Sequence, residues 1–315
     1  MKRVVVRARG GPEVLKWEEG PEPSVGRGEV LVRTEAIGVA FGDLMRRRGL
    51  LAPPGPFTPG YDLVGRVEGG PRNGERVAVF MPRVGFGAYA EQVAVREADL
   101  VSVSQGVSAS KAVALGLNYI TARHILDMLD LPEGGSLLVH GAAGGVGTAM
   151  LELGSAAGLR LWGTASAGKH PRVQSYGATA IDYRNEDFTD VVSELDAVVD
   201  PIGGDHLARS LSVLGPKGTL VAFGVTGDVD RGYLGMLPGL GWLARTAMTD
   251  WSRLKLYGIG ATHSLAAGRA AWTELLSKAE TLHPVVGAEL PFEEVSRAHR
   301  LLEQRAVEGK VVLVR

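Results

Sequence analysis

Hydrophobic and polar positions alternate through much of the first hundred residues. Between Val30 and Ala36, Arg33 and Glu35 alternate with apolar or smaller residues, which is typical of a half-buried strand. Similar segments, bounded by Gly-Gly, Pro and Asn-Gly turns, occupy residues 62–68, 74–80 and 88–95. A proline-rich loop is expected at 51–59. This part of the chain is therefore predicted to be a compact, barrel-like β unit.

Beyond residue 108 the pattern changes, first to helices and then to short apolar segments separated by helices. Helical spacing covers residues 112–117 and 119–129. Strands are predicted at 136–140, 159–164, 180–183, 197–200 and 219–223, and the helices between them include 146–157 and 205–214. Strands that alternate with helices indicate a parallel sheet with helices on both faces.

The last third of the chain contains one segment whose role the pattern leaves open. Residues 233–251 are largely apolar and include Trp242; they could roof a substrate pocket, contact a second subunit or pack into the core. Residues 256–260 resume a strand, which could be an edge strand that pairs with a second subunit. Two helices and a final strand are predicted at 270–278, 292–305 and 310–314.

Composition excludes several classes of protein. The 315 residues include 44 glycines and no cysteine, and 45% are hydrophobic. There are 34 basic and 35 acidic residues. This hydrophobic content excludes a disordered or collagen-like chain. The missing cysteine excludes disulfides, thiolate catalysis and cysteine-based metal sites. A net charge of −1 gives no electrostatic reason to expect nucleic acid or an anionic membrane as a partner.

Targeting signals are not evident in the sequence either. No apolar run reaches the roughly 18 residues that a membrane-spanning helix needs, and the run after Met1 is too short for a signal peptide. We therefore expect a cytoplasmic protein with no membrane partner.

A cluster of glycines lies between a predicted strand and a predicted helix, at residues 140–147 (HGAAGGVG). Small residues let the backbone approach a pyrophosphate, whose charge then meets the free N–H groups at the start of the helix. A tight turn without a ligand would also use glycine. The strand–turn–helix context and the alternation that follows it favour a dinucleotide site.

The end of the next predicted strand indicates which dinucleotide. Dinucleotide sites for NAD usually have Asp or Glu about 20 residues after the glycines, where it holds the ribose 2′-hydroxyl. This chain has Gly163-Thr164-Ala165-Ser166 there, followed by Lys169, His170 and Arg172. Small hydroxyls and cations suit a 2′-phosphate, so we predict NADP(H), although any one of these cations could simply be solvated.

Several collinear motifs carry a family likeness along essentially the whole chain. They are GGPEVL at 10–15, AIGV at 36–39 leading to Phe41 and Asp43, GAYAE at 87–91, AAGGVG at 142–147, IDYR at 181–184, VAFG at 221–224 and AHRLLE at 298–303. With them the chain resembles the zinc-free quinone oxidoreductases of the zeta-crystallin type, within the medium-chain dehydrogenase/reductase superfamily. The resemblance implies an α/β protein with a GroES-like β-rich catalytic domain, residues 1–117 and 263–315, and a Rossmann doubly wound parallel-sheet domain, residues 118–262.

The resemblance also implies a set of cofactor contacts. Thr121 would lie near the nicotinamide, and the pyrophosphate would lie at Gly144, Gly145 and Val146. The adenosine 2′-phosphate would be surrounded by Ser166, Lys169 and Tyr183. Further contacts would come from Phe41, Asp200, Phe223, Gly224, Val225, Thr226 and Arg305.

Zinc separates this chain from the alcohol dehydrogenases of the same superfamily. Those use a Gly-His-Glu turn and cysteine ligands, whereas this chain has Gly60-Tyr61-Asp62 and no cysteine. Its seven histidines are scattered along the sequence without a paired metal spacing. We therefore expect no metal.

The expected substrate end departs from the family pattern. The family commonly has Asn and Tyr where this chain has Ala40 and Met45, so we expect an apolar substrate pocket formed by Ala40, Met45, Tyr61 and Trp242. Arg46-Arg47-Arg48 could attract a phosphate-bearing acyl carrier, but such a run is more often a solvated helix face. Asp43 is the candidate catalytic residue, and capping of a helix start is at least as good an explanation for it.

These residues predict an NADPH-dependent oxidoreductase in which the cofactor carries the chemistry. The expected reaction is transfer of a hydride to a conjugated carbonyl, in a quinone, an α,β-unsaturated ketone or an enoyl thioester, free or carrier-bound. A non-catalytic NADPH-binding protein, with a sensing or crystallin-like structural role, is the alternative. A homodimer is the expected assembly.

Overall fold

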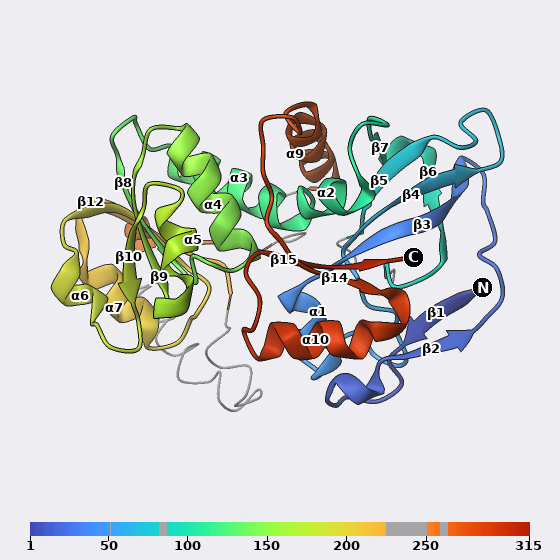
Figure 1. Cartoon of the computed structure of the whole chain (residues 1–315), viewed down its shortest axis with the longest axis horizontal. Helices are drawn as coiled ribbons and strands as arrows, with labels where there is room; N and C mark the ends of the chain where they lie inside the picture. The colour runs from blue at the N-terminus through green and yellow to red at the C-terminus, as the bar shows by residue number, and fades with distance from the viewer. Residues whose placement is uncertain (51, 82–86, 225–250, 259–263) are drawn as a thin grey trace. The chain divides into compact units, whose positions relative to one another are not determined.

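The computed structural model describes residues 1–50, 52–81, 87–224, 251–258 and 264–315. Val225, Thr226 and Trp242 lie outside these residues. The chain forms two compact units (Figure 1): unit 1 comprises Met1–Ile120 with His263–Arg315, and unit 2 comprises Thr121–Thr262. The domain boundaries predicted from the sequence, after residues 117 and 262, stay a prediction.

Unit 1 is built on a seven-stranded sheet in the order β14-β15-β3-β4-β5-β7, with β6 paired to β3. Its strands are β3 (Glu29–Val39), β4 (Asp62–Glu68), β5 (Arg76–Phe80), β6 (Gln92–Arg96), β7 (Leu100–Ser102), β14 (Val286–Pro291) and β15 (Lys310–Val314). A separate sheet pairs β1 (Lys2–Val5) with β2 (Lys16–Glu19). Val32 and Thr34 of β3 are buried while Arg33 is exposed, so the alternation predicted for this segment is confirmed.

The helices of unit 1 pack against this sheet or connect its strands. They are α1 (Phe41–Arg47), α2 (Ala109–Ala114), the start of α3 (Leu117–Leu129), α9 (Leu265–Ser277) and α10 (Val295–Glu303). Trp272 of α9 is fully buried, and its indole N–H donates to the carbonyl of Ala112 in α2 at 3.2 Å. The pattern of apolar residues did not predict α1, because this seven-residue helix is too short to show a helical period.

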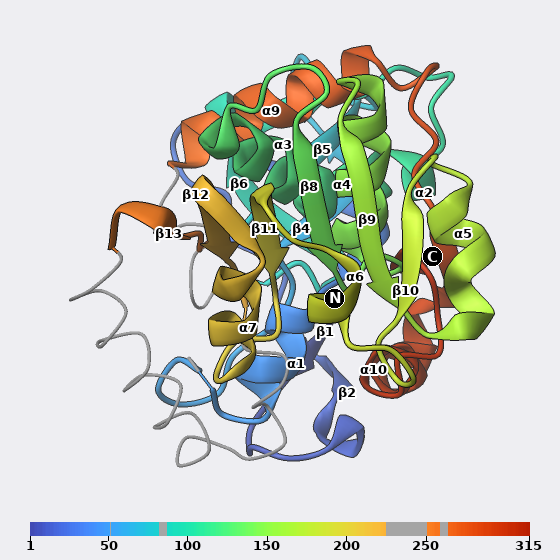
Figure 2. The ribbon, with the colours of Figure 1, turned by 90° about the vertical axis from the view of Figure 1, so that its left-hand side faces the viewer.

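Unit 2 is a six-stranded parallel sheet in the order β10-β9-β8-β11-β12-β13, shown in Figure 2 with β8 between β9 and β11. Its strands are β8 (Ser136–His140), β9 (Arg160–Ala165), β10 (Thr179–Asp182), β11 (Leu195–Asp200), β12 (Leu214–Ala222) and β13 (Leu254–Leu256). The intervening helices are α4 (Gly145–Ala156), α5 (His170–Gln174), α6 (Phe188–Val191) and α7 (His206–Ser212).

The strand order places a ligand site at the carboxyl ends of the strands of this sheet. The chain runs from β8 outward through β9 and β10, and then returns to the other side of β8 with β11. In open parallel sheets ligands bind at the carboxyl ends of the strands where the order reverses in this way. The last residues of β8, β9, β10 and β11 are His140, Ala165, Asp182 and Asp200.

Several boundaries differ from the sequence prediction; for example, the helix expected at 270–278 is α9 (Leu265–Ser277), and the strand expected at 219–223 is β12 (Leu214–Ala222). The strand expected at 256–260 is Leu254–Leu256, and Tyr257 and Gly258 are not part of it. The helix expected at 292–305 is a short 3₁₀ turn, Phe292–Glu294, followed by α10. β13 is the last strand of the sheet within the described residues, and its pairing with a second subunit stays a prediction. Among these residues, no helix is long and apolar enough to cross a bilayer.

Candidate functional site

The turn between β8 and α4 presents backbone N–H groups that suit an anion. Gly141 has a φ of +66°, a left-handed conformation that glycine adopts without steric cost. Gly144 is the N-cap of α4, and no side chain caps it. The first N–H groups of a helix have no intrahelical partner and attract phosphates. Gly144 is exposed and Gly145 and Val146 are half-buried, so the residues expected at the pyrophosphate are accessible in unit 2.

Gly147 lets α4 approach this turn closely. A Cβ atom at position 147 would overlap the carbonyl oxygen of Gly141 and the backbone of Ala142. Any larger residue would therefore push the helix away from the turn and displace the N–H groups that the turn presents.

The residues expected around a 2′-phosphate meet at one edge of the sheet. Ser166 and Lys169 follow β9, and Tyr183 follows β10. Because β9 and β10 are neighbouring parallel strands, their carboxyl ends lie side by side. Tyr183 is 45% exposed. Residues 166–172 contain no carboxylate, although this is where an acidic residue would hold a ribose 2′-hydroxyl.

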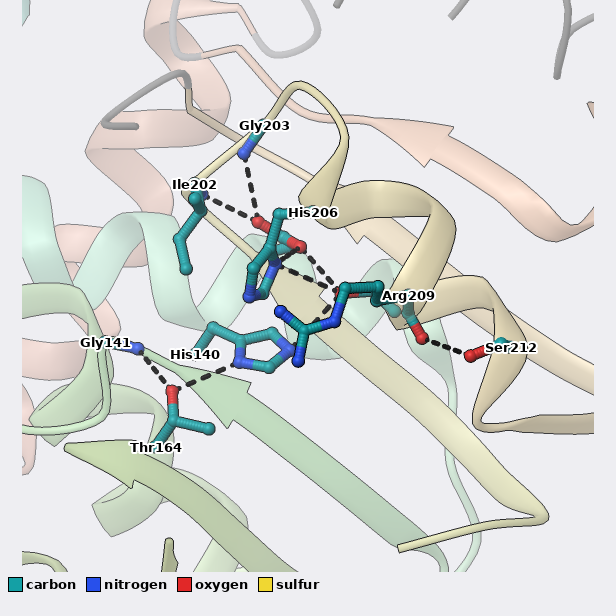
Figure 3. A network of polar contacts seen from close by, with 10 residues as sticks. His140, Gly141, Thr164, Ile202, Gly203, His206, Arg209 and Ser212 are labelled. Carbon is teal, nitrogen blue, oxygen red and sulfur yellow. Dashed lines mark hydrogen bonds and ion pairs between the residues drawn. The ribbon is translucent and has the colours of Figure 1, made fainter. Parts of the chain in front are cut away.

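The carboxylate of Asp200, at the end of β11, is the centre of a buried hydrogen-bond network, part of which Figure 3 shows. Its Oδ1 accepts from the backbone N–H groups of Ile202 at 2.7 Å and Gly203 at 3.2 Å, and its Oδ2 accepts from His206 Nδ1 at 2.6 Å and the Ser210 hydroxyl at 2.7 Å. Burial by itself raises the pKa of Asp200, but the hydrogen bonds from His206 and Ser210 and the nearby histidines outweigh it and lower the pKa to about 2. Asp200 is therefore an anion that holds the turn after β11.

Counting protons fixes the direction of the hydrogen bonds beyond Ser210. A serine hydroxyl has one proton, and Ser210 donates it to Asp200, so its oxygen accepts from His140 Nε2 at 3.3 Å. The other ring nitrogen, Nδ1, then accepts from the Thr164 hydroxyl at 3.1 Å. The Thr164 oxygen accepts from the N–H of Gly141 at 3.3 Å. Burial lowers the pKa of His140 to about 3, so a neutral imidazole joins the glycine turn to Asp200 (Figure 3).

Two of the histidines that are scattered along the sequence meet in the fold. The ring centroids of His140 and His206 lie 4.4 Å apart, and with Asp200 these residues place three possible metal ligands within 4.8 Å of one another. Hydrogen bonds already occupy these atoms. The 2.6 Å between His206 Nδ1 and Asp200 Oδ2 is also shorter than the about 3.3 Å that separates two ligand atoms on a tetrahedral zinc ion. The cluster is therefore built as a hydrogen-bond network.

Thr121, expected near the nicotinamide, lies in a second buried polar cluster of unit 2. It is hydrogen-bonded to the hydroxyl of Tyr257, which lies 3.2 Å from His124 Nδ1. Burial raises the pKa of Tyr257 to about 12. The sequence motifs indicated neither His124 nor Tyr257. The spacing of Thr121 and His124, three residues apart on one helix face, was the available signal, and the approach of Tyr257 is a tertiary contact.

Asp43 lies in the first turn of α1 in unit 1 and is fully buried. Its carboxylate accepts from the N–H groups of Ala40 at 3.1 Å and Gly60 at 2.8 Å, and from the Tyr89 hydroxyl at 3.3 Å. The Tyr89 oxygen lies 3.0 Å from His299 Nε2. Burial raises the pKa of Asp43 to about 6. These bonds fasten the start of α1 to the loop at Gly60, which is the helix-start role considered above, and the catalytic role of Asp43 stays a prediction.

The expectation of a solvated arginine run is wrong. Arg47 is fully buried and forms an ion pair with Glu303, which also lies 2.9 Å from Nη2 of Arg48. Arg46 is only 9% exposed, and its guanidinium carbon lies 4.4 Å from the ring centroid of Tyr61. Burial raises the pKa of Tyr61 to about 12. Arg46 and Arg47 therefore belong to the interior of unit 1, whereas Arg48 is half-buried.

The other predicted residues divide between the two units. Phe41, at the start of α1, and Arg305, just after α10, belong to unit 1, as do the expected substrate residues Ala40, Met45 and Tyr61. Phe223 and Gly224 follow β12 in unit 2, and the N–H of Phe223 donates to the carbonyl of Asp200 at 3.0 Å. Ala40 and Tyr61 are buried, and Met45 is half-buried.

Comparisons with known proteins agree with this architecture. Residues 26–105 match the alcohol dehydrogenase GroES-like domain, and residues 176–313 match the zinc-binding dehydrogenase family. The synaptic vesicle membrane protein VAT-1 homolog of Rattus norvegicus is 32% identical over 100% of this chain and 84% of its own length. The quinone oxidoreductase of Pseudomonas aeruginosa is 32% identical over 99% of both chains. The chain belongs to the quinone oxidoreductase family of the medium-chain dehydrogenases/reductases.

A solved structure supports the same placement within the medium-chain dehydrogenases/reductases. The quinone oxidoreductase of Escherichia coli, complexed with NADPH, matches this chain with a TM-score of 0.86 and 28% identity over 100% of both chains. The predicted fold, a GroES-like β-rich part with a Rossmann-like parallel sheet, is confirmed.

Proposed function

We propose that this member of the quinone oxidoreductase family binds NADPH on unit 2 and reduces a conjugated carbonyl compound without zinc. The proposal rests on the arrangement of residues at the carboxyl ends of β8, β9 and β10. There an accessible glycine turn lies at the start of α4, and Ser166, Lys169 and Tyr183 replace an acidic ribose ligand. The complex of the Escherichia coli relative with NADPH supports the choice of cofactor.

The residues present fit this cofactor. The N–H groups of Gly145 and Val146 would hold the pyrophosphate. It would lie against Gly144, whose own N–H donates to the carbonyl of Gly141 at 2.9 Å. Ser166, Lys169 and Tyr183 would hold the 2′-phosphate. When it is bound, NADPH supplies the hydride. The chain binds and orients the nucleotide, and the hydrogen-bond network of His140 and Asp200 keeps the turns after β8 and β11 in place.

Independence from zinc is supported by the environment of Asp62. Its carboxylate is fully buried, lies 3.2 Å from the ammonium of Lys310 and accepts from the N–H of Leu117 at 2.9 Å. The preceding residue is Tyr61, whose raised pKa keeps its phenol neutral. Reduction should therefore be unchanged after extensive dialysis against a chelator, and loss of activity that zinc restores would contradict this part of the proposal.

The substrate class is tested by a panel of quinones, α,β-unsaturated ketones and enoyl thioesters, with oxidation of NADPH followed by its absorbance. We expect turnover with at least one of these classes. If NADPH binds tightly but none of them is reduced, the alternative of a non-catalytic NADPH-binding protein replaces this proposal.

The choice of cofactor has its own test. NADPH should bind more tightly than NADH, and Lys169→Ala should narrow that difference by about tenfold, the loss expected for one charge-assisted phosphate contact. Lys217→Ala removes an exposed lysine of unit 2 at a position not expected to contact the cofactor and is the control. Equal affinities for NADPH and NADH in the unmodified protein would overturn the assignment.

A further inference from the structure

The Arg46 guanidinium is a largely buried cation of unit 1. It is 91% buried, yet within the described residues it forms no hydrogen bond or ion pair through its side chain. Its neighbours differ, because Arg47 and Arg48 both bind Glu303. None of its nitrogens is among the fully buried polar atoms without a partner in the described part of the chain, so its N–H groups stay accessible to an acceptor.

The position of Arg46 is held by stacking on Tyr61. The guanidinium lies over the ring at 4.4 Å from its centroid, a geometry in which the ring face attracts the cation. The ring fits against α1 because residue 42 is glycine, and a Cβ atom there would overlap the Tyr61 hydroxyl. Stacking uses the face of the guanidinium and leaves its N–H groups, which lie in its plane, available to an acceptor.

Asp43 is a candidate partner for Arg46, because the charge of Arg46 acts on its carboxylate, but it is engaged elsewhere. Its two oxygens accept from two backbone N–H groups and from Tyr89. The charge of Arg46 opposes the burial that raises the pKa of Asp43, yet no ion pair joins the two side chains among the described residues. Ala40 and Leu44, on either side of Asp43 in the sequence, are apolar and buried. The N–H groups of Arg46 are therefore available to bind a small anionic group.

We propose that Arg46, stacked on Tyr61, donates hydrogen bonds to the carbonyl oxygen of the substrate and stabilises the negative charge that forms on it during reduction. This inference rests on the proposed function. Two electrons and one hydrogen arrive at the β-carbon as hydride from NADPH, the carbon–carbon π electrons move to give an enolate oxygen, and water then protonates the α-carbon. Arg46 is therefore a catalytic residue that acts on charge developed in the transition state.

The first test separates catalysis from binding. Arg46→Met keeps an apolar side chain over Tyr61 and removes the donors, so kcat for the best enone or quinone should fall by about 10²- to 10³-fold, the loss typical for one oxyanion donor, with KM changed less than threefold. Arg46→Lys keeps the charge and should recover part of the rate. Arg48→Met removes a neighbouring charge of α1 and should leave kcat within threefold. A loss confined to KM in Arg46→Met would overturn the proposal.

The second test does not depend on turnover. 4-Nitrophenol mimics an enolate when ionised, and its absorbance reports its ionisation. Bound to the NADP⁺-loaded protein, it should ionise at least one pH unit below its value in solution, a tenfold preference for the anion, and Arg46→Met should abolish this shift while Arg46→Lys retains most of it. No binding, no shift, or a shift that Arg46→Met retains would overturn the proposal.

The two tests also distinguish failure of this inference from failure of the proposed function. An Arg46-dependent shift in a protein that reduces no quinone, enone or thioester would leave the anion site standing and remove the function. Reduction that proceeds equally well in Arg46→Met, with an unshifted probe, would do the reverse. Thermal unfolding of each variant confirms that it is folded before either result is used.

Discussion

Replacing Asp200 with asparagine tests whether the network behind the glycine turn serves the nucleotide site. Asn has nearly the same shape, but it carries no charge and offers one acceptor oxygen where Asp200 uses two to accept four hydrogen bonds. The amide group of Asn would face donors that already point at the site. We therefore expect Asp200→Asn to destabilise unit 2 and to loosen the turns after β8 and β11.

The magnitude follows from the pKa of Asp200. The pKa falls from 3.8 to about 2 on folding, and each unit corresponds to about 1.4 kcal/mol, so the ionised carboxylate contributes about 2.5 kcal/mol at pH 7. Because the pKa is lowered, this stability is present above about pH 4 and is lost as the pH falls toward 2. At pH 3 about half of it, roughly 1.3 kcal/mol, remains. For a unit of this size 2.5 kcal/mol corresponds to a Tm lower by about 5–10 °C.

The assay compares Asp200→Asn with Asp196→Asn. Asp196 lies on the same strand, at its other end, and accepts from the N–H and the hydroxyl of Ser136 at 2.8 and 2.7 Å. Thermal unfolding at pH 7 and pH 3, and NADPH affinity by fluorescence, are measured for both variants. Asp200→Asn should lower the NADPH affinity by about tenfold and Asp196→Asn should leave it unchanged. Equal affinities in the two variants, or a stability difference from the unmodified protein that does not shrink at pH 3, would refute the reasoning.

Three further predictions follow from the same geometry. Gly147→Ala should lower both Tm and NADPH affinity, because its Cβ would overlap the Gly141 turn. Gly144→Ala, at a φ of −78° that suits alanine, should keep Tm and lower only the affinity. A larger loss of Tm in Gly144→Ala than in Gly147→Ala would contradict the close approach of α4. Asp43→Asn removes a group whose pKa is raised to about 6. The stability of the unmodified protein relative to this variant, from urea unfolding, should therefore be greatest below pH 4 and fall by up to about 3 kcal/mol as the pH rises through 6, and a pH-independent difference would disprove the raised pKa. Lys310→Met leaves the buried carboxylate of Asp62 without its cation and should cost about 3–5 kcal/mol in urea unfolding, while the double variant with Asp62→Asn should cost less than the sum of the single changes; additive losses would show that the pair is not coupled.

Local sequence determined most of the secondary structure and the nucleotide turn. The period-two alternation of β3 and the apolar runs of β8 and β11 report burial directly, because a strand exposes alternate residues on one face and a central parallel strand exposes neither face. The glycines of residues 141–147 were also readable, since a left-handed φ and a close helix approach each require glycine locally. The missing acidic residue after β9 indicated the cofactor for the same local reason.

Tertiary structure alone decided which polar residues act together. His140 and His206 lie 66 positions apart in the sequence, and no spacing rule brings them to one carboxylate; only the return of the chain to β11, beside β8, does so. The arginine run shows the same limit, because Glu303 and Tyr61, from distant segments, determine that Arg47 forms an ion pair and Arg46 a stack. Periodicity records how one element faces the core, whereas the partner of a buried charge depends on which elements the fold places next to it.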